Sequence, residues 1–269
     1  MNESVLVEEA APGIRLMRLN RADRLNAMNA DLVQGLRDAL RAVRDDASVR
    51  AIVLTGDGSA FCAGLDLRGY GRTPGAGEVE GRPQETFRVQ KHISELHEDF
   101  RGTRAPVIAA INGAAVGGGM SLALFCDIRM MSVEASIHPA FIKRGLSNAD
   151  IGSSWLLPRV VGFSTASEIL LTGRTLDAEE ALRIRLVSSV HDPAGLVSAA
   201  IEKGLAIAAN SPMGVWMTKE ALWSNLETPS FRAAIDLENR TQILCSMTED
   251  HQEAVAAFLE KRAPRYRNH

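Results

Sequence analysis

The chain has 269 residues, of which 46% are hydrophobic and 23% are charged, and these are the proportions of a soluble globular protein with a full core. Thirty Lys and Arg residues stand against 33 Asp and Glu, so the net charge of −3 excludes a basic surplus of the kind that binds nucleic acid or an anionic membrane. Any polyanionic ligand must therefore be met by a few local charges.

The cysteines and the N-terminus indicate a reducing compartment. Cys62, Cys126 and Cys245 are spaced like neither a disulfide framework nor a zinc site, so no metal is implied. Residues 1–4 lack the positive and apolar regions of a signal peptide. We therefore expect a cytoplasmic protein.

The first half of the chain is predicted to alternate strands and helices. Strands 5–7 and 14–19 form a hairpin, and Asn29 is the expected N-cap of the helix that follows. Apolar runs and helical periodicity then predict strands at 49–54, 107–111 and 128–131 and a helix at 84–101. This alternation is typical of an α/β core.

After about residue 150 the strand signal almost vanishes. Helices are expected at 164–171, 177–184, 193–209 and 248–262. We therefore divide the chain into an α/β core over residues 1–200 and a helical region over residues 201–269.

Residues 105–126 carry no charge and are long enough to span a bilayer. However, Pro106, Asn112 and the run Gly117, Gly118 and Gly119 interrupt the stretch, and irregular glycine-rich backbone is poorly tolerated in lipid. We therefore predict a buried strand, a loop and a buried helix. Residues 69–83, with five Gly and two Pro, are expected to form a mobile loop.

Two glycine-containing turns, at residues 61–67 and 112–119, each follow a predicted strand. The second opens a helix, whose free N–H groups favour negative charge. Two such N–H groups converging on one thioester carbonyl would form an oxyanion hole. Each turn by itself is more often only a tight turn. Neither matches a dinucleotide fingerprint or a Walker loop.

The motifs in their order along the chain carry more information than either turn. They are NRADRLNAM (20–28), AFCAGLDL (60–67), APVIAAING (105–113) followed by the triple glycine, CDI (126–128), LTGR (171–174), LVS (186–188), TED (248–250) and AFLEKR (257–262). In this order they resemble the crotonase, or enoyl-CoA hydratase/isomerase, superfamily over essentially the whole chain.

The resemblance implies a crotonase-like spiral of ββα repeats with a C-terminal helical trimerisation region, assembled as a homotrimer or hexamer. It implies an acyl-CoA thioester as substrate, with coenzyme A as part of that substrate and no separate cofactor. By motif position, the N–H groups of Leu65 and Gly118 form the oxyanion hole. The implied substrate-binding residues are Arg24, Asn26, Ala63, Asp66, Leu67, Phe258 and Lys261, although a solvated charge is an equal alternative for Arg24.

The chain departs from the family at the catalytic carboxylates. Hydratases place one Glu two residues after the triple glycine and another four residues before a Gly, and these positions are here Ser121 and Phe141. Neither side chain performs the usual acid–base work, so the two-Glu hydration mechanism is not supported. Phe141 is expected to line the substrate site instead.

Asp150 is the candidate replacement, because it matches an Asp that some isomerases of the family use for proton transfer. The alternative is that Asp150 caps the helix expected near Ser153. His138 is a weaker acid–base candidate. Ser121 as a nucleophile lacks a recognisable His and Asp partner.

The sequence thus predicts an acyl-CoA-processing enzyme that polarises the thioester carbonyl without two catalytic Glu residues. Two alternatives stay open. The first is an enoyl- or dienoyl-CoA isomerase, or other crotonase-type chemistry, that uses Asp150. The second is a non-catalytic CoA-binding homologue.

Overall fold

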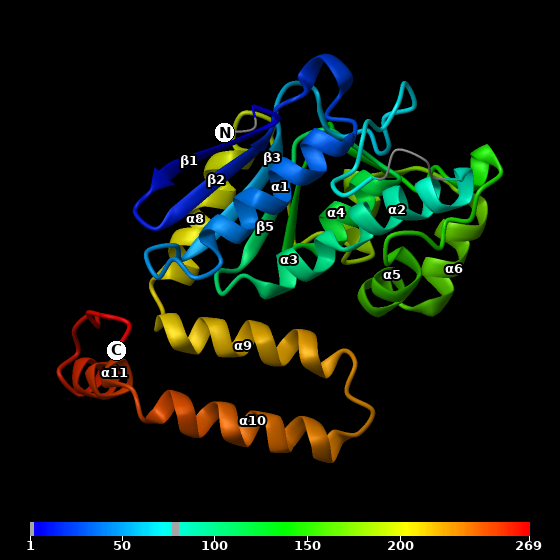
Figure 1. Cartoon of the computed structure of the whole chain (residues 1–269). Helices are drawn as coiled ribbons and strands as arrows, with labels where there is room; N and C mark the ends of the chain where they lie inside the picture. Colours follow the sequence, from blue (N-terminus) through cyan, green and yellow to red (C-terminus); the bar gives the residue numbers. More distant parts are fainter. Residues whose placement is uncertain (1–2, 77–80) are drawn as a thin grey trace.

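The computed structural model describes residues 3–76 and 81–269, and its core is built on two sheets (Figure 1). The larger sheet begins with an antiparallel hairpin and continues with parallel strands. Its order is β1 (Val5–Ala11), β2 (Ile14–Leu19), β3 (Ala51–Gly56), β5 (Val107–Ile111), β7 (Ile128–Ser132) and β10 (Ser189–His191).

The smaller sheet has the order β4 (Ala60–Cys62), β6 (Ala114–Val116), β8 (Ser136–His138) and β9 (Leu176–Asp177). Three successive turns of the chain each give one strand to each sheet, as the pairs β3 and β4, β5 and β6, and β7 and β8. This is the expected ββα spiral, and the prediction of an α/β fold of this type is confirmed.

Helices α1 to α7 lie between the strands in the sequence, and helices α8 to α11 follow the last strand. In chain order they are α1 (Ala30–Val43), α2 (Arg82–Ser94), α3 (Leu96–Gly102), α4 (Gly118–Phe125), α5 (Ser153–Val161), α6 (Phe163–Thr172), α7 (Ala178–Arg183), α8 (Leu196–Ala208), α9 (Pro212–Asn225), α10 (Phe231–Ser246) and α11 (Glu249–Leu259), with short 3-10 turns at Ala22–Arg24 and Ile142–Arg144.

The larger sheet is buried on both faces. Alternate side chains of a strand point to opposite faces, so a single strand contributes residues to two apolar clusters. On β3, Ile52 and Leu54 belong to the main apolar cluster, which also includes residues of α1, α3 and α4. Ala51 and Val53 face the other side, where α8 covers the sheet. The strand therefore reads as a continuous apolar run in the sequence.

The uncharged stretch 105–126 forms β5, the short strand β6 and the buried helix α4, as predicted apart from the extra strand. Within the described ranges, the structure contains no helix with the length and apolar character needed to cross a bilayer.

Several boundaries differ from the predictions. The expected helix 84–101 is two helices, α2 and α3, that meet at Glu95. Helices α9 and α10 were not among the predicted helices; in α9 the apolar and polar residues mix around the circumference. The expected division at residue 200 falls inside α8, which packs on the larger sheet, so the helices that leave the core begin with α9.

The glycine-rich loop is tied to the core at Tyr70. The Tyr70 carbonyl accepts a hydrogen bond from the Ala30 N–H at 2.7 Å, and the Tyr70 hydroxyl lies 2.8 Å from His92 Nδ1. Of the expected loop, residues 77–80 lie outside the described residues, and residues 82 and 83 already belong to α2.

Candidate active site

Three segments that are far apart in the sequence meet beside the N-terminus of α4. The first two run side by side through backbone hydrogen bonds. The Met28 N–H donates to the Gly64 carbonyl at 2.6 Å, and the Asp66 N–H donates to the Met28 carbonyl at 2.9 Å. Farther along, the Ala63 N–H donates to the Leu25 carbonyl at 2.9 Å. The 61–67 loop is therefore held along residues 25–28.

The third segment, which opens α4, packs directly against this loop. Gly64 has a φ of +85°, and a Cβ atom placed on it would lie 2.6 Å from the Val116 carbonyl oxygen and 3.5 Å from the Gly118 nitrogen. At Gly119 a Cβ atom would lie only 2.1 Å from the Cys62 carbonyl oxygen. Glycine is required at these positions because the two backbones approach so closely.

This approach brings together two candidate backbone donors. Among the described residues, neither the Leu65 N–H nor the Gly118 N–H donates to a backbone carbonyl. Gly118 is the first residue of α4, where N–H groups lack partners within the helix and the helix dipole is positive. An oxygen that carries partial negative charge is the chemical group that suits such donors.

The positions where hydratases carry Glu hold no carboxylate here. Ser121 is fully buried on α4, and its Oγ donates weakly to the Asp150 carbonyl oxygen at 3.5 Å. The Phe141 ring covers the glycine turn, since a Cβ atom on Gly117 would lie 3.0 Å from Phe141 Cζ.

Asp150 supplies a carboxylate near this wall. It does not cap α5, because Gly152 is the N-cap residue and no side chain accepts the helix N–H groups, so the capping alternative is wrong. Its Oδ1 instead accepts a hydrogen bond from Gln90 Nε2 of α2. Burial raises the pKa of the Asp150 carboxyl, while the hydrogen bond from Gln90 opposes that rise.

Ile151 connects Asp150 to the candidate donors. Its Cδ1 would lie 3.4 Å from a Cβ atom on Gly118, and it has a φ of +45°, which is rare for a β-branched residue. Leu25 and Asn26 also have positive φ values, of 51° and 54°. Strained backbone of this kind is concentrated at functional sites.

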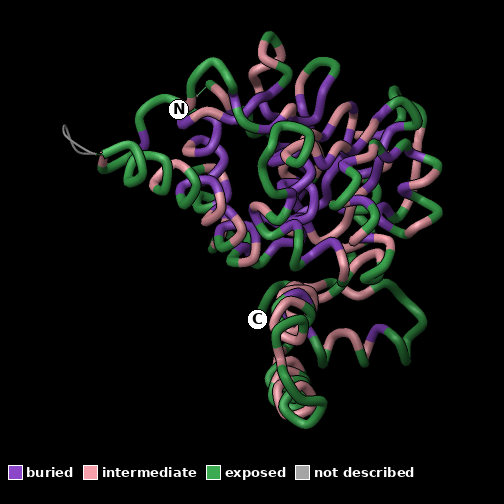
Figure 2. Tube along the Cα trace, turned by 90° about the vertical axis from the view of Figure 1, so that its right-hand side faces the viewer, coloured by how far each residue is buried: buried purple, intermediate pink, exposed green. Residues whose placement is uncertain are grey.

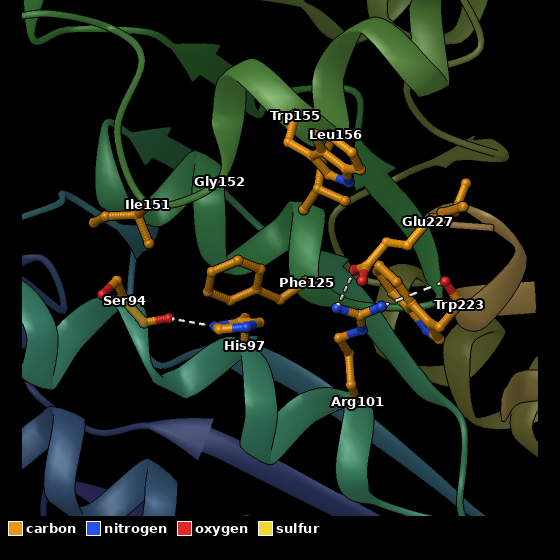
Figure 3. Close-up of a pocket in the computed structure, with 11 residues that line it drawn as sticks. Ser94, His97, Arg101, Phe125, Ile151, Gly152, Trp155, Leu156, Trp223 and Glu227 are labelled. Atoms are coloured by element: carbon orange, nitrogen blue, oxygen red, sulfur yellow. Dashed lines mark hydrogen bonds and ion pairs between the residues drawn. The ribbon is translucent and has the colours of Figure 1, made fainter. Parts of the chain in front are cut away.

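A cavity of about 290 Å³ begins at Ile151 and extends between α3, α4, α5 and α9 (Figure 3). Its walls combine aromatic and aliphatic side chains with one ion pair. The lining residues are Ser94, His97, Arg101, Phe125, Ile151, Gly152, Trp155, Leu156, Trp223, Leu226 and Glu227. Sequence reasoning identified neither Gln90 nor His97, because only the tertiary fold brings α2 and α3 against residues 150–156.

Two of the predicted substrate-binding residues, Asn26 and Arg24, differ in how far the protein itself satisfies the hydrogen bonds of their side chains. The amide group of Asn26 is fully buried and bonds only to backbone, accepting from the Arg21 N–H and donating to the Asp57 and Ala60 carbonyls. Arg24, by contrast, has a buried Nη1 with no hydrogen-bond partner among the described residues, and its Nε lies 3.3 Å from Asp23.

Within the 61–67 loop, the side chain of Asp66 is committed to the protein. Its carboxylate accepts the Arg68 N–H at 3.0 Å and pairs with Arg21 at 2.9 Å, and these two interactions lower its pKa. Leu67 is 75% exposed and Ala63 is partly buried. Backbone groups and the exposed side chains of Leu65 and Leu67 are therefore the parts of this loop that are free to contact a ligand.

Phe258 and Lys261 are exposed at the end of α11, and Figure 1 places α11 across the molecule from α2. The structure of one chain does not bring them to the glycine loops. His138, the weaker acid–base candidate, lies between the hydroxyls of Ser136 and Thr175, at 2.7 and 2.9 Å. Burial and then Lys143 lower its pKa.

The spiral with two sheets, together with glycine loops that meet at the start of α4, defines the crotonase class of proteins. A family model described as "Enoyl-CoA hydratase/isomerase" matches residues 9–269. The chain therefore belongs to the enoyl-CoA hydratase/isomerase family, whose members are enzymes of acyl-CoA thioesters.

Individual relatives cover nearly the whole chain. A Mycobacterium tuberculosis protein named "Probable enoyl-CoA hydratase EchA12" is 41% identical over 97% of this chain and 91% of its own length. The 1,2-epoxyphenylacetyl-CoA isomerase of Escherichia coli is 33% identical over 97% of both chains. The crystal structure of a Mycobacterium abscessus protein, described as a "probable enoyl-CoA hydratase/isomerase", has a TM-score of 0.92 at 39% identity and covers 98% of this chain and 99% of that one.

Proposed function

We propose that the chain isomerises the double bond of an enoyl-CoA thioester, with Asp150 as the group that moves the proton. The observation that carries this proposal is the half-buried carboxylate of Asp150 beside Ile151, next to a wall where Ser121 and Phe141 stand in place of Glu. A single carboxylate is enough for isomerisation, since the reaction adds nothing to the substrate.

In this proposal the N–H groups of Leu65 and Gly118 hydrogen-bond the thioester oxygen. Within the described part of the chain they have no backbone acceptor, and glycines at 64 and 119 let the two loops approach. Negative charge grows on that oxygen when a proton leaves the α-carbon, so the donors bind the enolate more strongly than the substrate. Removing one such donor from an enzyme typically costs about 100-fold or more in rate.

The proton transfer is balanced within the substrate. The Asp150 carboxylate takes a proton from the α-carbon of a 3-enoyl thioester, and the electron pair delocalises to the thioester oxygen. The resulting carboxylic acid returns the proton to the γ-carbon, which leaves the 2-enoyl thioester and the original carboxylate. The raised pKa of Asp150 suits both steps, because the group must be both base and acid.

The coenzyme A part of the substrate is proposed to contact Arg24, whose side chain is partly exposed and whose guanidinium has a donor, Nη1, without a partner among the described residues; a guanidinium is suited to phosphate. The backbone of residues 63–67 would accept the adenine, and the Asn26 side chain would act by fixing the turn rather than by touching the ligand. Phe258 and Lys261 could reach coenzyme A only across a contact between subunits, which accords with the expected trimer or hexamer.

The test compares Asp150→Asn with the unchanged protein on 3-hexenoyl-CoA. We expect the unchanged protein to form the conjugated 2-enoyl thioester, followed by its ultraviolet absorbance, without mass gain by mass spectrometry. Asp150→Asn should lose at least about 100-fold in kcat, as is typical when a general acid–base group is removed. Ser121→Ala should retain activity because, among the described residues, its hydroxyl hydrogen-bonds weakly to the Asp150 backbone carbonyl and to no other group.

The matched control is Asp45→Asn, which changes an exposed carboxylate in the same way. Normal turnover by a folded Asp150→Asn variant would remove Asp150 from the mechanism. A mass gain of one water would show hydration instead. Acyl-CoA binding without turnover across a panel of thioesters would favour the non-catalytic alternative.

A further inference from the structure

The cavity beyond Ile151 is partly open, and an ion pair lies on its wall between α3 and the chain that follows α9. There Arg101 Nη1 of α3 lies 2.7 Å from Glu227 Oε1, and the Arg101 guanidinium stacks 5.1 Å from the centre of the Trp223 ring. The volume of about 290 Å³ is at the lower end of ligand pockets, which typically begin at about 300 Å³. The cavity therefore suits a compact group rather than a long acyl chain.

The cavity walls are flat as well as apolar. Phe125 and Trp155 approach from α4 and α5, and Trp223 approaches from α9 (Figure 3). The Trp155 ring is held in place because the Arg159 guanidinium stacks on it at 3.4 Å. Rigid aromatic faces pack well against a ring, with offset or edge contacts that add to simple burial.

One polar side chain on the cavity wall, His97, can accept a further hydrogen bond. His97 lies opposite Phe125, with 6.1 Å between the ring centres, and its Nδ1 is 2.8 Å from the Ser94 carbonyl oxygen. A carbonyl only accepts, so Nδ1 carries the proton, and in the neutral ring Nε2 is an acceptor. Among the described residues, no partner of Nε2 is found.

We propose that this cavity binds a compact, ring-bearing acyl group that donates a hydrogen bond to His97 Nε2, such as a hydroxylated aryl or alicyclic acyl group. This substrate class rests on the proposed function, since the cavity continues from the residue that touches Gly118. His97 is then a specificity-determining residue, because a bound ring without the hydroxyl would cover the Nε2 acceptor and leave it without a hydrogen bond.

The test measures binding, by calorimetry, of saturated thioesters that cannot react. The probes are 4-phenylbutanoyl-CoA, its 3-hydroxyphenyl and 4-hydroxyphenyl analogues, and dodecanoyl-CoA. We expect one hydroxylated analogue to bind about tenfold more tightly than the plain phenyl compound, the value of one hydrogen bond. Dodecanoyl-CoA should bind more weakly than any of the ring compounds.

His97→Phe keeps a ring of similar shape but removes the acceptor, so it should bind the hydroxylated and plain compounds equally. His97→Gln retains a carbonyl acceptor and should keep part of the preference, which protects the test if the Phe variant folds poorly. Equal binding of all ring compounds by the unchanged protein, or a preference that survives in His97→Phe, would overturn the proposal.

The same experiment separates this inference from the proposed reaction. Saturated thioesters report on the cavity even if the chain catalyses a different step. If neither coenzyme A nor any of its thioesters bound, the proposed function and the cavity assignment would both be rejected. Tight dodecanoyl-CoA binding with weak binding of every ring compound would reject the cavity assignment alone.

Discussion

At the scale of single residues, function depends on which side chains remain uncommitted. The side chains of Asp66 and Asn26 are hydrogen-bonded within the protein. Arg24 and His97, by contrast, each have a side-chain nitrogen without a partner among the described residues. Asp150 is intermediate, since hydrogen bonds from the Gln90 side chain and the Ile151 backbone oppose the effect of burial on its pKa. The pH dependence of the proposed reaction therefore tests Gln90.

The proposed base works as a carboxylate, so kcat should fall as the pH falls through the pKa of Asp150. Burial raises that pKa above 3.8, and the Gln90 hydrogen bond lowers it. Gln90→Leu should consequently move the acid limb of the kcat profile to higher pH, with kcat at high pH changed less than about threefold. Gln84→Leu, on the same helix, is the control and should leave the limb in place. An unchanged limb in Gln90→Leu would show that Gln90 does not position Asp150.

At the scale of elements, α9 matters because it forms the far wall of the cavity. It is fastened to the core by Lys219, which is 5% exposed and donates to the Phe100 and Ala105 carbonyls and to the Thr103 hydroxyl at 2.9 to 3.1 Å. Lys219 also pairs with Asp127 at 3.0 Å. Trp223 Nε1 of the same helix donates to Asp127 at 2.6 Å.

Lys219→Met should lower the free energy of unfolding by about 3–5 kcal/mol, because it leaves the Asp127 carboxylate without its ammonium partner. Chemical denaturation measures this change. Lys91→Met breaks an exposed pair with Glu95 and should cost less than about 1 kcal/mol. The double variant Asp127→Asn/Lys219→Met should recover part of the loss. Equal costs for Lys219→Met and Lys91→Met would refute the fastening role.

At the scale of the whole molecule, the C-terminal helices are incompletely packed. Figure 2 shows the buried residues concentrated in the sheet core, and α10 has no buried residue. Large apolar side chains are exposed along α10 and α11, namely Phe231, Ile243, Leu244, Met247, Val255, Phe258 and Leu259. A surface of this kind favours burial against other copies of the chain.

We therefore expect the protein to sediment as a trimer or hexamer. Leu244→Glu combined with Met247→Glu should shift it toward the monomer, because charges would enter the contact. Leu6→Glu, an exposed apolar position on β1, is the control and should leave the mass unchanged. A monomeric unchanged protein at micromolar concentration in analytical ultracentrifugation would contradict this expectation.

Local patterns predicted much of the fold and part of the site. Asn29 caps α1 as expected, since its side chain accepts the Leu32 N–H, and β5 has the predicted bounds. The break at Glu95 and the helices α9 and α10 were missed; the apolar residues of α9 are spread around the helix, and α10 buries no residue against the core.

By itself, the sequence predicted the first five strands of the larger sheet, the two glycine loops and the replacement of the usual Glu residues by Ser121 and Phe141, but not the strands of the smaller sheet. Tertiary structure alone decided that Gln90 contacts Asp150, that His97 lines the cavity beyond Ile151 and that Lys219 fastens α9 to the core. The physical reason is the separation along the sequence of the residues that interact. Periodicity and turn chemistry act over a few residues, whereas these contacts join residues that lie on different elements far apart in the sequence and exist only once the spiral has closed.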